Sequence, residues 1–147
     1  MTRVCFVTGA ARGIGRGLVE RLSSAGHSVH AADVDLEGLE HTARSRRWPS
    51  RVRPAGLDVR DADSWARRYE QAESDTGPID LHINCAGVLH PGWTEALDPH
   101  QVSRMIDVNF KGVVLGTQRA AASMALPIQT RGSRAMLPSR DRAKACS

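Results

Sequence analysis

The sequence predicts an α/β fold in which helices cover both faces of a parallel sheet. Short apolar runs alternate along the chain with longer segments whose apolar residues recur every three or four positions, as expected for strands joined by helices. A glycine-rich turn separates the first apolar run from the first helical segment. The composition is that of a globular domain, since 24% of the 147 residues are charged and 41% are hydrophobic.

The first two strand and helix pairs follow directly from this alternation. Residues 3–8 and 28–33 are short apolar runs, which predicts two buried strands. A helix is predicted between Gly13 and Gly26, because apolar residues recur there four positions apart. Asp35 is the predicted N-cap of the second helix.

The next pair contains a proline that restricts its position. Residues 52–57 are predicted to form a third strand, and Pro54 favours an edge position because proline cannot donate to a sheet. Asp61 is the predicted N-cap of a third helix, which ends at Gly77. A fourth strand is predicted over residues 79–84.

A long helix is predicted from about His100, after a loop rich in turn-forming residues. Five residues define its apolar side: Val102, Ile106, Phe110, Val113 and Val114. The complete order of elements is βαβαβαβα, which is typical of a doubly wound sheet with parallel strands.

The charge distribution divides the chain at residue 116. Residues 1–116 carry a net charge of −1 and hold every aromatic residue, whereas residues 117–147 carry a net charge of +5. A segment with few large apolar side chains cannot offset the entropy lost when it orders. We therefore predict one domain over 1–116 and a basic, poorly structured C-terminal tail over 117–147.

Composition also limits the location of the protein. The sequence contains no apolar run of the length that crosses a membrane, and the apolar stretch at its start is too short for a signal peptide. Its three cysteines, Cys5, Cys85 and Cys146, are far apart and odd in number. These features favour a reducing, cytoplasmic location and no membrane partner.

The turn after the first strand has the sequence Thr8-Gly9-Ala10-Ala11-Arg12-Gly13-Ile14-Gly15. Glycines allow a tight turn and the close approach of a pyrophosphate to backbone N–H groups at a helix N-terminus. A glycine-rich connector without a ligand is the alternative, which the strand and helix on either side disfavour. We expect the cofactor-binding residues of this turn to be Gly9, Ala11, Arg12, Gly13, Ile14 and Gly15.

An acidic residue ends the second predicted strand. Asp33 lies 18 positions after Gly15, close to the spacing at which a carboxylate binds the ribose of a dinucleotide. The same carboxylate repels a 2′-phosphate, which favours NAD over NADP, although Arg12 is a counter-signal. The alternative role for Asp33 is to cap the next helix.

With these features in place, the chain resembles the short-chain dehydrogenase/reductase family over residues 3–116. The matching motifs are the glycine turn, Asp33, Leu57-Asp58-Val59, Asn84-Cys85-Ala86-Gly87 and Asp107-Val108-Asn109. The resemblance implies a Rossmann-like doubly wound sheet, here truncated, with strand order 3-2-1-4. It also implies an NAD(P)-dependent oxidoreductase that transfers hydride between nicotinamide and an alcohol or carbonyl carbon.

The resemblance assigns roles to residues outside the glycine turn. It places Asp58 and Val59 against the adenine, and it implies that Asn84, Ala86 and Gly87 stabilise the sheet and border the cofactor. It makes Asn109 a member of the catalytic set, where it holds a water in a proton relay. Cys85 departs from the family pattern, which has a second Asn at this position.

The remaining catalytic residues implied by the resemblance are a Ser and a Tyr followed four positions later by a Lys. The single tyrosine, Tyr69, is followed at that distance by Glu73, and the lysines are Lys111 and Lys144. We therefore predict that Tyr69 packs a helix and that the chain is inactive by itself. A frameshift or truncation near residues 117–125 explains the change in pattern, and a genuine divergent tail is the alternative.

Two other functions remain open at this point. The chain could be a non-catalytic fragment that binds a dinucleotide or a partner, and a substrate would then bind only to a full-length form. The basic tail could bind nucleic acid, but it lacks aromatic residues for base stacking.

Two further features of the sequence concern a metal site and self-association. A site made of His82, Cys85 and His90 is disfavoured, because a spacing of three does not bring His82 and Cys85 to one strand face. We therefore predict no metal. The fourth strand, with Leu81 and Ile83, would be an exposed edge, so self-association through this strand and the long helix is expected.

Overall fold

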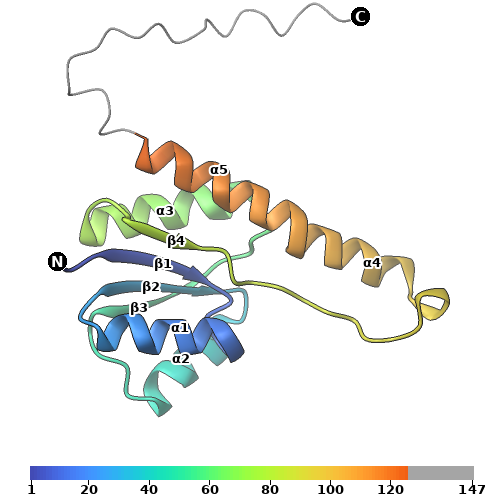
Figure 1. Ribbon diagram of the computed structural model, residues 1–147, viewed down its shortest axis with the longest axis horizontal. Coiled ribbons are helices and arrows are strands. Elements are labelled where there is room, and N and C mark those ends of the chain that lie inside the picture. The colour runs from blue at the N-terminus through green and yellow to red at the C-terminus, as the bar shows by residue number, and fades with distance from the viewer. Residues whose placement is uncertain (126–147) are drawn as a thin grey trace, which may run out of the picture.

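A four-stranded parallel sheet forms the centre of the molecule (Figure 1). The computed structural model describes residues 1–125. Its strands lie in the order β3-β2-β1-β4, which confirms the predicted topology. Their bounds are Val4–Thr8 for β1, Ser28–Asp33 for β2, Val52–Gly56 for β3 and Leu81–Ile83 for β4.

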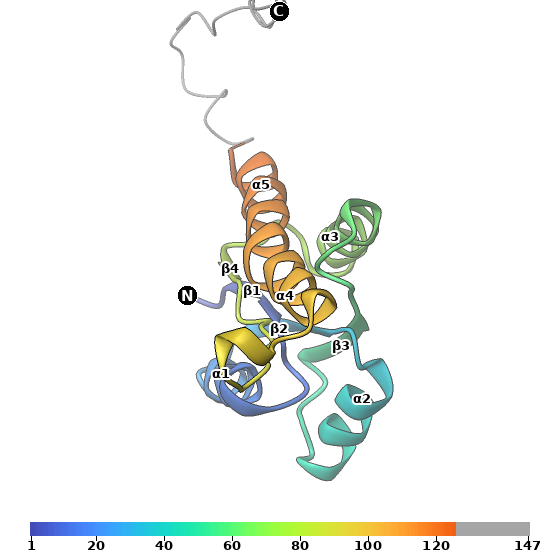
Figure 2. The same cartoon turned by 90° about the vertical axis from the view of Figure 1, so that its right-hand side faces the viewer.

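Helices cover both faces of this sheet (Figures 1 and 2). One face carries α1 (Gly13–Ser24) and α2 (Leu36–Ser45), and the other carries α3 (Ala62–Thr76) and α5 (Gly112–Met124). This arrangement is the doubly wound, Rossmann-like fold expected from the order of elements.

The local signals in the sequence were mostly correct. Asp35 caps α2 by accepting a hydrogen bond from the Gly38 N–H at 2.9 Å, and Asp61 caps α3 by accepting from Asp63 at 3.0 Å. Pro54 lies in β3, which is an edge strand, as predicted. Strand β4 is shorter than the predicted range 79–84, because its register with β1 covers only Leu81–Ile83.

Alternation along the strands divides the core into two clusters. On β1, Cys5 and Val7 belong to the cluster under α1 and α2, whereas Phe6 belongs to the cluster under α3 and α5. Successive side chains of a strand point to opposite faces, so one strand supplies both cores. The sheet is therefore buried on both sides, as expected for parallel strands.

The predicted long helix has three consecutive parts. Helix α4 (Pro99–Ile106) begins at a capping box formed by Asp98, a π-helical turn spans Asp107–Lys111, and α5 follows without interruption (Figure 1). The buried residues of α5 have little or no side chain: Gly112, Gly116 and Ala120. Val108, Leu115 and Met124 pack against the same core while only partly buried.

The apolar side predicted for this helix faces outward. The exposed fractions run from 37% at Val102 and Val113 to 68% at Phe110, with Val114 at 40% and Ile106 at 56%. The packed side is instead set by close approach: a Cβ at Gly112 would lie 2.8 Å from Val59 Cγ2. Large side chains on that side would hold the helix away from the domain.

The predicted domain boundary at residue 116 falls inside α5, so the ordered domain does not end there. Residues 117–124 are helical, Ala120 is 6% exposed, and Ser123 donates a hydrogen bond to Glu73 on α3. The change in charge at residue 116 did not mark a structural break, because this alanine-rich segment favours a helix. The rest of the predicted tail, residues 126–147, lies outside the described part of the chain.

Candidate functional site

A cavity of about 330 Å³ opens at the carboxyl ends of the strands. This volume is within the range typical of small-molecule sites. Its walls come from the glycine turn, the ends of β2 and β3, the segment after β4, and α4. Ten of the residues proposed from the sequence line it: Gly9, Arg12, Gly13, Ile14, Gly15, Asp33, Asp58, Val59, Ala86 and Gly87.

The glycine turn brings the backbone close to the segment after β4. Gly9 has φ +67°, and a Cβ there would lie 2.8 Å from the Ala86 Cα, so a larger residue would separate the two segments. Helix α1 then begins with no capping side chain at Arg12 and no acidic residue in its first turn. The N–H groups at this helix end are therefore suited to an anion.

Thr8 connects this turn to β4. Its hydroxyl oxygen accepts hydrogen bonds from the backbone N–H groups of Cys85 and Ala86, each at 3.0 Å, and the hydroxyl donates to the Ile83 carbonyl at 3.4 Å. Thr8 belongs to the glycine-turn motif, and its place directly before Gly9 is the sequence signal for this otherwise unassigned role. The side chain fixes the spacing between two walls of the cavity.

Asp33 is held in one orientation at the end of β2. One carboxylate oxygen accepts a hydrogen bond from the Ala11 N–H and the other from the Asp35 N–H, both at 3.0 Å. The capping of α2 is performed by the Asp35 side chain. Asp33 is therefore a fixed carboxylate in the cavity wall, with lone pairs left for a ligand.

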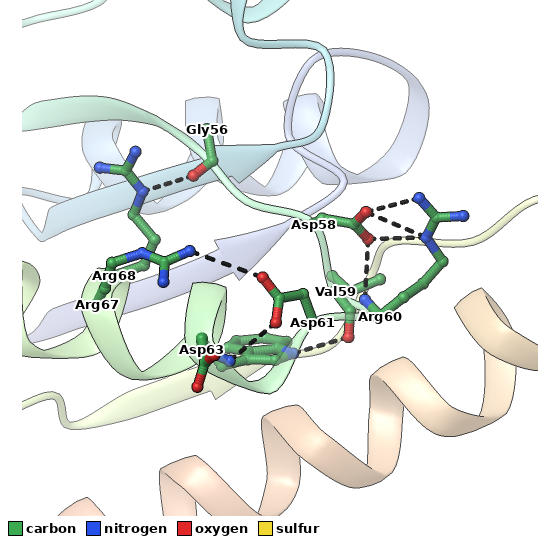
Figure 3. Close-up of polar contacts among 9 residues, drawn as sticks. Gly56, Asp58, Val59, Arg60, Asp61, Asp63, Arg67 and Arg68 are labelled. Atoms are coloured by element: carbon green, nitrogen blue, oxygen red, sulfur yellow. Dashed lines mark hydrogen bonds and ion pairs between the residues drawn. The ribbon is translucent and has the colours of Figure 1, made fainter.

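Asp58 and Arg60 form an ion pair in the wall after β3 (Figure 3). The closest approach is 2.6 Å, between Arg60 Nη2 and Asp58 Oδ2. The guanidinium of Arg60 holds the pKa of the Asp58 carboxyl below its ordinary value, and the carboxylate raises the pKa of Arg60. Both groups therefore remain charged near neutral pH.

Three residues proposed from the sequence do not line the cavity: Ala11, Asn84 and Asn109. Ala11 acts through its backbone bond to Asp33. Asn84 lies toward α5, where it donates to the Thr117 hydroxyl at 3.2 Å and accepts from His82 at 3.0 Å. Its contacts are those of a residue that holds the sheet and α5 together.

Asn109 lies in the π-helical turn between α4 and α5. Its amide oxygen accepts from the Val88 N–H at 2.9 Å, and its amide nitrogen donates to the Val88 carbonyl at 2.8 Å. This bidentate contact ties the loop after β4 to the long helix. The water-holding role implied for Asn109 stays a prediction.

Several wall residues were not proposed from the sequence. The cavity is also lined by Ala32, Val34, Leu57, Arg60, Cys85, Val88, Arg104 and Val108. Leu57, Cys85 and Val108 belong to the motifs named above, so membership of a motif could have identified them as wall residues. No local pattern identified Arg104, because α4 comes far later in the chain than the glycine turn.

Tyr69 is fully buried, and it packs a helix, as predicted. Its hydroxyl is 2.5 Å from His82 Nδ1, on the α3–α5 side of the sheet. Burial raises the pKa of Tyr69, which keeps the phenol protonated. The only tyrosine of the sequence is therefore outside the cavity and unsuited to acid–base chemistry there.

The residues weighed as a metal site are separated in the structure. His82 bonds to Tyr69 and Asn84, whereas Cys85 lies in the cavity wall, where burial raises the pKa of its thiol. Within residues 1–125, no group of three or more His, Cys, Asp or Glu side chains is arranged to hold a metal ion.

Comparison with known proteins identifies the family. A sequence model described as short chain dehydrogenase matches residues 3–135. The chain belongs to the short chain dehydrogenase family. The match continues past residue 116, so the resemblance extends further than the motifs indicated, into α5 and beyond.

Relatives and solved structures agree with this assignment. The chain is 36% identical over 112 residues to a 2,3-dihydro-2,3-dihydroxybenzoate dehydrogenase of Bacillus subtilis, covering 76% of this chain and 43% of that protein. It is 31% identical over 123 residues to a 3-oxoacyl-(acyl-carrier-protein) reductase of Thermotoga maritima, covering 83% and 50%. The chain thus spans about half the length of the curated relatives it matches.

Among solved structures, a 3-ketoacyl-(acyl-carrier-protein) reductase from Brucella melitensis, complexed with NADH, matches with a TM-score of 0.77 and 29% identity. The match covers 82% of this chain and 49% of that one. A second short-chain dehydrogenase/reductase from Brucella melitensis gives a TM-score of 0.76 at 29% identity, over 82% and 52%. In the described part of this chain, no helix is long and apolar enough to span a membrane.

Proposed function

We propose that this chain binds NAD in the cavity at the carboxyl ends of the strands. The observation that carries the proposal is the fixed carboxylate of Asp33, which the Ala11 and Asp35 N–H groups hold in the cavity wall. A carboxylate at this position is suited to accept hydrogen bonds from the two ribose hydroxyls. The uncapped start of α1 is suited to the pyrophosphate, since its N–H groups have no side-chain acceptor.

The proposal favours NAD over NADP. A 2′-phosphate would meet the negative charge of Asp33 directly, and like charges at close range repel strongly in a partly buried site. Arg12 also lines the cavity and could attract a phosphate. We give Asp33 more weight because two backbone hydrogen bonds fix its position, whereas Arg12 makes no capping hydrogen bond at the start of α1.

The chemistry of the family is hydride transfer, for which bound nicotinamide supplies or accepts the hydride. The residues described here bind and orient the dinucleotide, and Asn109 positions the loop after β4 through Val88. The 147 residues contain no Tyr-x-x-x-Lys sequence. We therefore propose that this chain by itself binds the cofactor without turning over an alcohol or carbonyl substrate.

Fluorescence titration with NADH tests the proposal. The unmodified chain is expected to bind NADH, and Asp33→Arg to lose at least about tenfold in affinity, because a charged hydrogen bond contributes roughly 1.5–3 kcal/mol. Asp63→Arg is the matched control, since Asp63 lies at the exposed start of α3 outside the cavity. Absence of NADH binding, or equal affinities of the parent and Asp33→Arg, would contradict the proposal.

Two secondary expectations accompany it. We propose a cytoplasmic location, because Cys5 and Cys85 are free thiols in the described structure.

We also propose self-association, because β4 pairs only with β1 within residues 1–125 and Phe110 is 68% exposed. Sedimentation of the unmodified chain and of Phe110→Glu tests self-association. The variant should sediment with a lower mass than the unmodified chain, and equal masses would contradict self-association through this helix.

A further inference from the structure

A row of four hydrogen-bonded side chains connects α3, β4 and α5: Tyr69, His82, Asn84 and Thr117. The Tyr69 hydroxyl is 2.5 Å from His82 Nδ1, and His82 Nε2 is 3.0 Å from Asn84 Oδ1. Asn84 Nδ2 then donates to the Thr117 hydroxyl at 3.2 Å. Figures 1 and 2 show α3 and α5 on the same face of the sheet. None of the four side chains lines the cavity, so cofactor contact does not explain them.

The row fixes which nitrogen of His82 carries a hydrogen. The amide nitrogen of Asn84 donates to Thr117, so its amide oxygen faces His82. An amide oxygen only accepts, and His82 Nε2 therefore donates to it. In a neutral ring Nδ1 is then the acceptor, and it takes the hydrogen bond of the Tyr69 hydroxyl. Neutral His82 thus satisfies every bond in the row.

A proton on His82 would break this arrangement. Its second N–H would point at the Tyr69 oxygen, so the phenol would have to turn its own hydrogen away. Within residues 1–125, His82 is the one hydrogen-bond partner of that hydroxyl, and Tyr69 is fully buried. A buried donor without an acceptor is costly. Burial also lowers the pKa of His82, so the folded chain favours the neutral ring.

The groups around His82 do not favour its charged form. The Phe6 ring on β1 stacks on the His82 ring, with 6.0 Å between the centroids. The Arg119 guanidinium reaches the same region from α5, where it lies 5.6 Å from the centroid of the Tyr69 ring. Burial and the negative charge of Glu73 on α3 raise the pKa of Tyr69. Protonated His82 would therefore place a second positive charge beside Tyr69, on which Arg119 already lies.

The row is connected to the cavity through the segment that follows β4. Residues 85–88 form part of the cavity wall. The long helix holds this segment at both ends, because Asn84 bonds to Thr117 and Val88 bonds to Asn109. Asn84 is also the acceptor for His82. A change in the hydrogen bonding of His82 therefore reaches the wall through the residue directly before it.

We propose that His82 is a positioning residue for the bound dinucleotide and makes its binding proton-dependent. The neutral ring holds Asn84, and with it the wall after β4, in the arrangement that binds the cofactor. Protonation of the ring gives up this arrangement, so the affinity for the cofactor falls with pH. Because linkage is reciprocal, bound dinucleotide makes His82 harder to protonate. This inference rests on the proposed function, since it requires a dinucleotide in the cavity.

Fluorescence titration with NADH tests the inference between about pH 7.5 and the lowest pH, about 5.5, at which circular dichroism shows an unchanged fold. The dissociation constant should rise about threefold or more, within the limit of about tenfold per pH unit for one proton. The double variant Tyr69→Phe with His82→Leu should lose this rise. His30→Leu with Thr76→Val is the matched control and should keep it, because it removes another histidine of this face together with its partner.

A second measurement needs no variant. Nuclear magnetic resonance of the histidine rings follows the protonation of His82 in the unmodified chain, with and without NADH. The pKa of His82 should be lower when NADH is bound, as linkage requires. This readout separates positioning from a structural role, because a ring that only fills the core would titrate in the same way with and without the ligand.

The outcomes distinguish this inference from the proposed function. If NADH binds equally well at both pH values, or if the pKa of His82 does not respond to NADH, the inference is wrong although NADH binding stands. A rise in the dissociation constant that persists in the double variant, or that disappears in the control variant, would also contradict the assignment to His82. If the unmodified chain does not bind NADH at about pH 7.5, the proposed function fails and the inference with it.

Discussion

On the α1–α2 face of the sheet the fully buried core has no aromatic ring, whereas the core on the α3–α5 face includes Phe6, Trp65 and Tyr69 beside its aliphatic residues. The first core is built from residues such as Val7, Val29 and Leu39. In the second, Phe6 lies with its ring centroid 4.8 Å from that of Tyr69 and 6.0 Å from that of Trp65. The same strands thus supply two cores of different chemistry.

The α3–α5 face also contains a chain of hydrogen bonds that has no counterpart in the aliphatic cluster. It runs from α3 through β4 to α5, in the order Tyr69, His82, Asn84, Thr117. On the same face, the buried His30 bonds to Thr76 at 2.8 Å. Buried polar groups are costly unless they are paired, so this face depends on geometry more than the aliphatic face does.

The contrast between the two faces explains how the long helix is attached to the domain. Apolar area alone would favour burying its large residues, yet the fully buried residues of α5 are glycine and alanine, and Asn84, directly after β4, donates a hydrogen bond to Thr117. Shape and polar complementarity therefore decide the orientation of α5. The aliphatic face needs only apolar volume of about the right size.

The largest effect is expected from Trp65→Ala. Removing this buried ring leaves a cavity and an unpaired Val59 carbonyl, and should lower the free energy of unfolding by about 3–5 kcal/mol. Urea unfolding measures the loss, and hydrogen exchange should show α5 losing protection first, because the ring contacts Gly116. Leu39→Ala should also destabilise the protein, but with a loss of protection spread over all elements. Selective loss of protection in α5 of the Leu39→Ala variant would contradict the difference between the two faces.

Paired glycine substitutions should have opposite signs on the two faces. A Cβ at Gly116 would lie 2.5 Å from Asn84 Oδ1 and 2.7 Å from the Trp65 ring, so Gly116→Ala should cost about 1–3 kcal/mol. A Cβ at Gly17 on α1 meets nothing within 4 Å. Gly17→Ala should therefore stabilise by about 0.5–1 kcal/mol through helix propensity. Thermal melting measures the stability change of each variant. If both substitutions stabilise the protein, or both destabilise it, the difference in packing between α5 and α1 is wrong.

Tyr69→Phe tests the polar chain without removing the ring. It leaves Nδ1 of the half-buried His82 unpaired and should cost about 1–3 kcal/mol. The double variant Tyr69→Phe with His82→Leu removes both partners and should recover part of that loss. Chemical denaturation of the unmodified chain, of Tyr69→Phe, of His82→Leu and of the double variant gives the coupling free energy between the two residues. Strictly additive losses would show that the bond contributes nothing.

The smallest expected effect is the change in stability near neutral pH that comes from two histidines on the α3–α5 face, His30 and His82. Burial lowers the pKa of His30 and of His82 below the ordinary value of 6.5. The unfolded chain therefore binds these protons first, so stability is fully present above about pH 6.5 and declines as pH falls below it. The positive charge of Arg53 adds to the lowering at His30.

Urea midpoints measured between neutral and mildly acidic pH check this expectation. The double variant Tyr69→Phe with His82→Leu should show a shallower decline, because one of the two histidines with a lowered pKa is gone. Leu39→Ala should keep the slope of the unmodified chain. A slope that does not change in the double variant would show that His82 contributes nothing to it.

Much of the fold could be predicted, because its signals are local. N-caps such as Asp35 and Asp61, and the restriction imposed by Pro54, depend on a few neighbouring residues. The site was accessible for the same reason, since the glycine turn and Asp33 lie within one βαβ unit. Residues that reach the cavity from elsewhere, such as Arg104 on α4, have no local signature.

The sequence by itself determined the order of strands and helices, the turn at Gly9 and the carboxylate at Asp33, because periodicity and backbone restrictions act over short distances. Only the tertiary structure decided that the long helix turns Phe110 outward, and that Arg60 closes over Asp58 in the cavity wall. Helical periodicity shows that a helix has two sides. Which side packs depends on how closely the partner surface, here at Val59 and Trp65, allows the backbone to approach.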